Sequence, residues 1–113
     1  MPHLIVEATG QTIEALPNGE LMQKLHATAL ATDLFDEKSI KVRVRPYETA
    51  LIAGKPDDFV HVTIYLIDGR DKATKKRLAL KVHDEVRALC PSCASVSVDV
   101  RDLDREVYTK SQQ

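Results

Sequence analysis

Four stretches of the chain alternate between apolar and polar residues, as a β-strand does when only one of its faces is buried. They cover residues 2–8, 39–47, 59–68 and 95–101. Valine, isoleucine and leucine on one side of these stretches form an apolar sheet face. The other face carries side chains that are mostly polar, namely Lys41, Arg43, Arg45, His61, Thr63, Tyr65, Ser95, Ser97 and Asp99.

Two other stretches repeat their apolar residues at helical spacing. In residues 20–34 these are Leu21, Met22, Leu25, Ala29 and Leu30. The turn residues 17–19 just before them favour a helix entry. The second helix is expected to begin after Asp71, a good N-cap residue, and to continue through Leu89, with Pro91 ending it.

Three segments show neither period. Residues 10–18 and 54–58 contain glycine, proline and other turn residues, so both are predicted to be loops. The tail from 105 to 113 is polar, and we expect it to be loosely held.

The order strand–helix–strand therefore occurs twice, in pseudo-repeats covering residues 2–54 and 58–104 of a single domain, 1–113. Right-handed crossovers make the two strands of each unit parallel. Two units side by side predict an α+β fold, a four-stranded mixed sheet with both helices on one face. The opposite face is then open either to solvent or to other subunits.

Composition excludes several classes of partner. The chain has 16 basic and 17 acidic residues, a net charge of -1, no tryptophan and 4% aromatic residues. This balance argues against a nucleic-acid partner. No apolar stretch is long enough to span a membrane, and the start is unlike a signal peptide, so a cytoplasmic location is expected.

The string CPSC places Cys90 and Cys93 between the second helix and the last strand. Thioredoxin-type motifs instead open a helix after a strand, and a zinc site needs a second pair of ligands that the histidines do not supply. We interpret the pair as two thiols in a turn and expect no metal.

Pro2 offers chemistry that no other residue can supply. If Met1 is removed, the new N-terminus is a secondary amine, whose pKa near 7.7–8.0 is within reach of neutral pH. Nearby cations or burial then make it a proton acceptor at neutral pH. If Met1 is retained, the Pro2 nitrogen is an amide with no basicity.

Several strings resemble the tautomerase superfamily, and within it the 5-carboxymethyl-2-hydroxymuconate isomerases. They are MPHLIVEA, LATDLF, FVHVTIYLIDGR and HVTIYLIDGRDKATKKRLALKVHDEV. The resemblance covers nearly the whole chain. It implies a homotrimer of double β-α-β units that needs no cofactor, with pockets near the subunit boundaries.

The resemblance also implies a mechanism. The N-terminal proline, here Pro2, takes a proton from the hydroxyl of a muconate-like dienol diacid and returns it to a distant carbon. Arginines hold the substrate carboxylates, and Arg70 in the DGR string matches one of them. Lys41 stands where the family carries another arginine, and Arg43, two residues further on the same face, is an alternative ligand.

Other interpretations remain open for the individual residues and for the chain. Lys41 and Arg43 are equally well explained as a stripe of cations exposed to solvent. Arg45 is more simply explained as a contact with solvent or another subunit, and His61 as a hydrogen-bonded residue of the sheet. The second unit has neither a proline at Val60 nor a cation at Ser97, so we expect one site per chain. The alternatives to this isomerase are a non-catalytic ligand-binding trimer and a phenylpyruvate-type keto-enol tautomerase.

Overall fold

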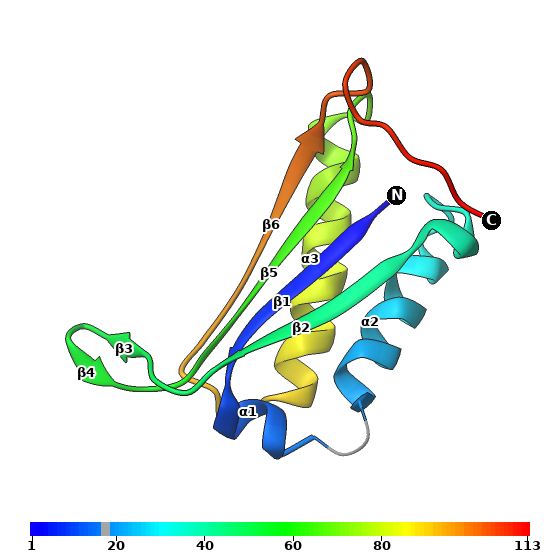
Figure 1. Cartoon of the computed structure of the whole chain (residues 1–113). Helices are drawn as coiled ribbons and strands as arrows, with labels where there is room; N and C mark the ends of the chain where they lie inside the picture. The colour runs from blue at the N-terminus through cyan, green and yellow to red at the C-terminus, as the bar shows by residue number, and fades with distance from the viewer. Residues whose placement is uncertain (17–18) are drawn as a thin grey trace.

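A four-stranded mixed sheet forms the centre of the protein, which is described here by a computed structural model for residues 1–16 and 19–113. Its strands are β1 (His3–Thr9), β2 (Lys41–Tyr47), β5 (Phe59–Ile67) and β6 (Ser95–Leu103), in the order β2-β1-β5-β6. The outer pairs β1–β2 and β5–β6 are parallel, and the central pair β1–β5 is antiparallel (Figure 1). The predicted α+β class and mixed sheet are confirmed.

Both long helices, α2 (Glu20–Ala31) and α3 (Lys72–Leu89), cover the same face of the sheet (Figure 1). The apolar core lies between this face and the helices. Its fully buried side chains include Leu4, Val6, Leu25, Val60, Val62, Ile64, Leu66, Leu78, Val82 and Val86. They come from alternate strand positions and from one side of each helix, as the two periods predict.

The start of α3 follows from its local sequence. The Asp71 carboxylate accepts a hydrogen bond from the Thr74 backbone N–H at 2.8 Å, which is the predicted N-cap. Gly69, just before it, has a φ of 114°, a conformation that side chains rarely adopt. A Cβ at this position would also lie 2.8 Å from Nη2 of Arg105, so that this exposed side chain would have to move, and the positive φ is the main reason for glycine here.

The end of α2 differs from the prediction, because the helix stops at Ala31 and not at Leu34. The Thr32 hydroxyl donates to the Ala29 carbonyl at 2.7 Å, and Asp33 adopts a left-handed φ of 59°. This local side-chain bonding competes with continuation of the helix. The predicted entry lies partly outside the described residues; Gly19 within them is the left-handed N-cap.

Both segments predicted as loops contain regular structure. Residues 10–18 include the short helix α1 (Gly10–Glu14). Residues 54–58 include β4 (Lys55–Pro56), which pairs with β3 (Leu51–Ile52) in a hairpin that projects from the body (Figure 1). Its two turn residues, Ala53 and Gly54, both have positive φ, the geometry of a type I′ hairpin turn.

The second strand begins later than predicted. A single 3₁₀ turn, η2 (Glu37–Ser39), precedes it, and β2 starts at Lys41. The Ser39 hydroxyl donates to the Asp36 carbonyl at 2.7 Å, which favours a turn over an extended strand at this position.

The tail is not loosely held, contrary to the prediction. After β6 the chain turns back and runs toward the N-terminus and the end of α2 (Figure 1). Tyr108 hydrogen-bonds with His3 at 3.1 Å, and the Gln112 side-chain amide donates to the Lys38 carbonyl at 2.6 Å. Arg105 forms an ion pair with Asp68 at 2.6 Å. The two ends of the chain therefore meet at one end of the sheet.

Candidate active site

The N-terminus is fixed at the start of β1 by two hydrogen bonds. The Lys41 backbone N–H donates to the Pro2 carbonyl at 3.0 Å, and the Ser39 hydroxyl donates to the Met1 carbonyl at 3.0 Å. Pro2 itself is fully buried. Because β1 and β2 pair in parallel with His3 opposite Lys41 and Ile5 opposite Arg43, the cations of β2 lie beside this terminus.

Electrostatics at the terminus favour a neutral amine. The pKa of the Met1 amine falls from 8.0 to about 6, chiefly through burial and then through the charges of Lys110, Lys41 and Arg70. The carboxylate of Asp36 opposes this shift. The structure thus brings two of the predicted cations, Lys41 and Arg70, to the N-terminus, and adds Lys110, which the sequence did not single out.

Arg70 is held in a defined orientation. Its Nη2 donates to the Leu34 carbonyl at 2.8 Å, its Nη1 to the Ile67 carbonyl at 3.3 Å, and its guanidinium carbon lies 5.2 Å from the centre of the Phe35 ring. A guanidinium has five N–H donors, so these two bonds leave donors for a bound anion. The side chain is half-buried, where a charge-assisted bond is stronger than in open water.

Lys41 and Arg43 are both hydrogen-bonded to other side chains. Nζ of Lys41 donates to Oε1 of Gln112 at 3.3 Å, as well as to the Ser39 carbonyl at 3.4 Å. Nη1 of Arg43 lies 3.1 Å from Nδ1 of His3. Lys41 is half-buried and Arg43 is exposed, so both can still reach a ligand.

His3 is a site residue that sequence reasoning missed. Burial, followed by Arg43, Lys41, the terminal amine and Lys110, lowers its pKa, so the ring is neutral at neutral pH. In the alternation of β1, His3 falls on the side opposite the buried Leu4, and this already indicated that it shares a face with Lys41 and Arg43. Lys110 and Gln112 of the tail could not be identified from the sequence in this way, because the tail has no periodic pattern of apolar residues.

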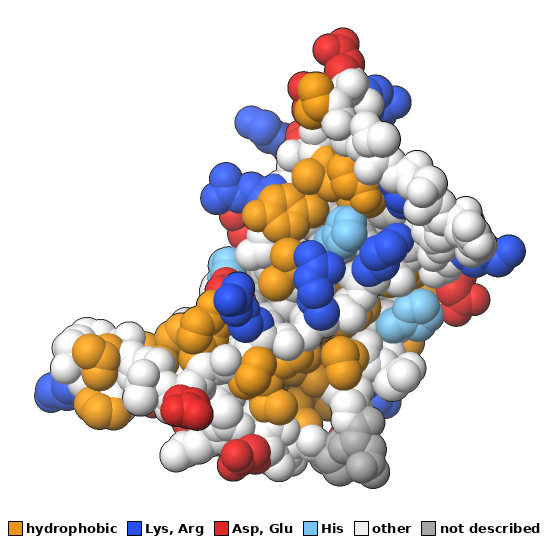
Figure 2. Space-filling view, in the orientation of Figure 1, with side chains coloured by type: hydrophobic (Ala, Val, Ile, Leu, Met, Phe, Trp, Pro, Cys, Tyr) orange, Lys and Arg blue, Asp and Glu red, His pale blue; other side chains and the backbone are white. Residues whose placement is uncertain are grey.

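Two other polar residues of this face, His61 and Arg45, lie opposite Glu7, further along β1 from the terminus. His61 hydrogen-bonds with Ser97 at 2.7 Å across the β5–β6 pair, which confirms it as a hydrogen-bonded sheet residue. Arg45 is exposed. Figure 2 shows this uncovered face, where lysine, arginine and histidine side chains lie among apolar ones.

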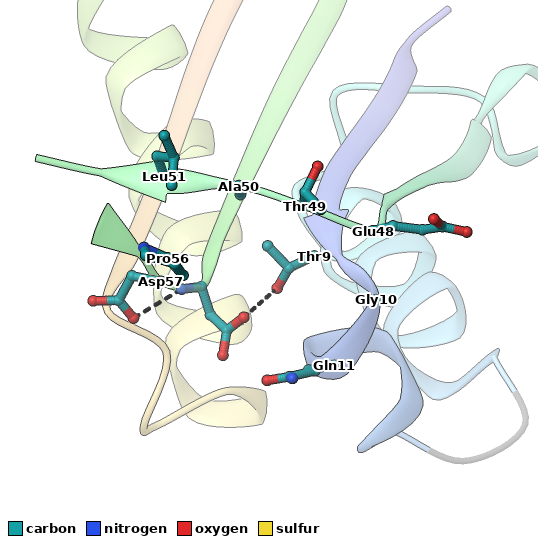
Figure 3. Close-up of a pocket in the computed structure, with 10 residues that line it drawn as sticks. Thr9, Gly10, Gln11, Glu48, Thr49, Ala50, Leu51, Pro56 and Asp57 are labelled. Atoms are coloured by element: carbon teal, nitrogen blue, oxygen red, sulfur yellow. Dashed lines mark hydrogen bonds between the residues drawn. The ribbon is translucent and has the colours of Figure 1, made fainter. Parts of the chain in front are cut away.

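Two cavities lie at opposite ends of β1. One of about 300 Å³ lies beside the N-terminus and is lined by Asp36, Lys38, Ser39, Lys110, Gln112 and Gln113. A larger one, of about 510 Å³, lies where the hairpin leaves the body (Figure 3). Its described lining includes Glu48, Asp57 and Asp58 but no lysine or arginine, so it is unsuited to a carboxylate. The charges of Lys41, Arg70 and Lys110 place the candidate site at the N-terminus, and the lining of the smaller cavity shares Lys110 with this cluster.

The two cysteines do not form a reactive pair. Both are buried free thiols, and burial, with the neighbouring Cys93, raises the pKa of Cys90. A raised pKa keeps this thiol protonated and weakly nucleophilic. Among residues 1–16 and 19–113, no group of three or more histidine, cysteine or acidic side chains is arranged to hold a metal ion. Nor does any helix in that part of the chain have the length and apolar character needed to cross a membrane.

The fold is that of the tautomerase superfamily. A fused 4-OT described as a symmetric trimer superposes with a TM-score of 0.79 over 98% of this chain and 93% of that chain, at 18% identity. A 5-carboxymethyl-2-hydroxymuconate delta-isomerase superposes with a TM-score of 0.80 over 100% of this chain and 89% of that chain, at 20% identity. A comparison with proteins of curated function gives no match.

The family can be stated more narrowly. A 5-carboxymethyl-2-hydroxymuconate isomerase from Deinococcus radiodurans R1 is 26% identical, with a TM-score of 0.77 over 99% of this chain and 90% of that chain. Residues 2–112 match the profile of the 5-carboxymethyl-2-hydroxymuconate isomerase family. The chain belongs to this family and is an isomerase, so the resemblance read from the sequence is confirmed.

Proposed function

We propose that this isomerase moves a proton along a dienol-type unsaturated dicarboxylate of the 5-carboxymethyl-2-hydroxymuconate class, a reaction of aromatic catabolism in the cytoplasm. After removal of Met1, the Pro2 amine is the acid/base. The observation that carries the proposal is the burial and charge around the N-terminus, which lower the pKa of the Met1 amine, one residue before Pro2, to about 6. Once Met1 is removed, we expect burial and the same cations to lower the pKa of the Pro2 amine below its usual range, so that it acts as a general base at neutral pH.

The proposed reaction needs no cofactor and is balanced in protons. Pro2 accepts the proton of the dienol hydroxyl as the carbonyl forms and the double bonds shift. The protonated amine then returns a proton to the distant carbon of the same molecule. Nearby cations stabilise the negative charge that develops on the dienolate between the two steps.

The cations around the terminus are proposed to hold the substrate carboxylates. Arg70, already oriented by two backbone carbonyls, is suited to a two-pronged bond with one carboxylate. Lys41 and Arg43 on β2 face the other. Lysine is a point charge, so Arg43 is the better candidate for a planar grip.

We also propose that the active form is a homotrimer. The sheet face opposite the helices carries half-buried apolar side chains, including Ile5, Phe59 and Ile67, among its polar ones (Figure 2). Edge strands β2 and β6 each pair on one side only within the described chain, and assembly removes such edges. The fused 4-OT relative is described as a trimer. Light scattering at micromolar concentration should give three times the chain mass; a monomer would contradict the proposal.

A substrate panel on untagged protein of known intact mass tests the function. Turnover of 5-carboxymethyl-2-hydroxymuconate by protein beginning at Pro2 is expected. Faster turnover of phenylpyruvate would instead assign a keto-enol tautomerase. Binding without turnover of either compound would assign a non-catalytic scaffold.

A further inference from the structure

The last ten residues of the chain, 104–113, contact Lys41 directly and Arg43 through His3, the two side chains of β2 that are candidates for binding a carboxylate. Oε1 of Gln112 accepts from Nζ of Lys41 at 3.3 Å, while its amide nitrogen is anchored on the Lys38 carbonyl at 2.6 Å. Tyr108 reaches Arg43 through the imidazole of His3.

The chemistry of the groups fixes the direction of this chain of bonds. A guanidinium has only donors, so Nδ1 of His3 must accept from Arg43. In a neutral imidazole the other nitrogen then carries the proton, and Nε2 donates to the Tyr108 hydroxyl at 3.1 Å. The two rings also meet edge to face, with centroids 6.3 Å apart and planes at 73°. Tyr108 thereby holds the imidazole in the tautomer and orientation that Arg43 needs.

We infer that the C-terminal segment is a positioning element of the active site, in which Tyr108 orients Arg43 through His3 and Gln112 orients Lys41. The inference rests on the proposed function for its ligand, a dicarboxylate. It explains how the exposed Arg43 can bind a carboxylate in this chain, which has Lys41 at the position where the family carries an arginine. A flexible exposed side chain loses conformational freedom on binding an anion, and a preformed contact reduces that loss.

The test uses full-length protein with Tyr108→Phe, which keeps the ring but loses the hydroxyl, and Gln112→Leu, which keeps the size but loses both polar atoms. Val107→Ala is the matched control, because this tail side chain is 75% exposed. The Kd for muconate is measured by calorimetry in parallel with turnover. Each tail variant should raise Kd and KM at least fivefold with kcat within twofold, because uniform binding is lost. Val107→Ala should change neither.

A double-mutant cycle separates positioning from a general structural effect. The loss of affinity for muconate caused by Tyr108→Phe should disappear in protein that already carries Arg43→Ala, because the hydroxyl then has no cation to position. Equal losses with and without Arg43, or unchanged Kd values in both tail variants, would overturn the inference.

Failure of the proposed reaction is distinguishable from failure of this inference. If the wild-type protein binds muconate but does not turn over substrate, the proposed reaction is contradicted. The double-mutant cycle measured on Kd then still tests whether the tail positions Arg43. Wild-type protein that turns over substrate, with tail variants unchanged in KM, contradicts the positioning alone. Wild-type protein that neither binds nor turns over contradicts both.

Discussion

Replacement of Arg70 separates a structural from a substrate-binding role. Arg70→Ala removes the bond to the Leu34 carbonyl at 2.8 Å, the longer bond to the Ile67 carbonyl at 3.3 Å, and the contact with Phe35. A charge-assisted hydrogen bond contributes about 1.5–3 kcal/mol, and an exposed cation–π contact about 0.5–1 kcal/mol. Because the Arg70 side chain is half-buried, water can bond to the exposed carbonyls in the variant and recover part of the lost stabilisation. We expect a loss of about 2 kcal/mol in the free energy of unfolding.

Activity should fall for a different reason. If Arg70 binds a substrate carboxylate, Arg70→Ala should lower kcat/KM at least tenfold for a dicarboxylate and much less for a monocarboxylate. Arg70→Lys retains the charge but not the two-pronged grip, so its loss should be intermediate. Initial rates on both substrates at a fixed protein concentration measure this, and urea unfolding of the same samples measures stability.

A control variant next to Arg70 lowers stability without removing a proposed substrate ligand. Asp71→Ala removes the N-cap of α3 next to Arg70 and should lower the free energy of unfolding, yet leave kcat/KM within twofold. Equal losses of kcat/KM for both substrates in Arg70→Ala, or a tenfold loss in Asp71→Ala, would refute the assignment of Arg70 to substrate binding and leave it a structural role.

Two further predictions test the electrostatics and the fold. Lys110→Gln should raise the pKa of the Pro2 amine, because the charge of this lysine lowers the pKa of the amine one residue away, at Met1. The acid limb of kcat/KM against pH then moves to higher pH. Lys76→Gln, on an exposed lysine that is not among the charges acting on the terminus, should leave the limb in place. Gly69→Ala should lower the free energy of unfolding by about 1–3 kcal/mol, owing to its φ and the nearby Arg105. Gly10→Ala, with ordinary contacts only, should cost no more than about 1 kcal/mol, and equal losses would show that Gly69 is not strained.

The periodic elements were predictable because their side chains report directly on burial. The alternation in β5 and the apolar spacing in α3 fixed the sheet, its covered face and the cap at Asp71. The projecting hairpin was missed because its turn uses Ala53, a residue without a turn preference, at a positive φ. Local competition at Thr32 likewise shortened α2 without changing the apolar pattern.

The site was only partly predictable. Lys41 and Arg70 were named from the resemblance, and the structure places their charges beside the N-terminus. Lys110 and Gln112 could not be found, because their positions depend on how the tail folds back over β1 and β2. Nothing in a short polar segment specifies such a path.

The central claim is that a free Pro2 amine is the base. One preparation that retains Met1, verified by intact mass, is assayed before and after treatment with a methionine aminopeptidase. The account predicts that turnover of the dicarboxylate is absent at first and rises in proportion to the fraction of chains that begin at Pro2. Equal rates in the Met1-bearing and processed protein would contradict it.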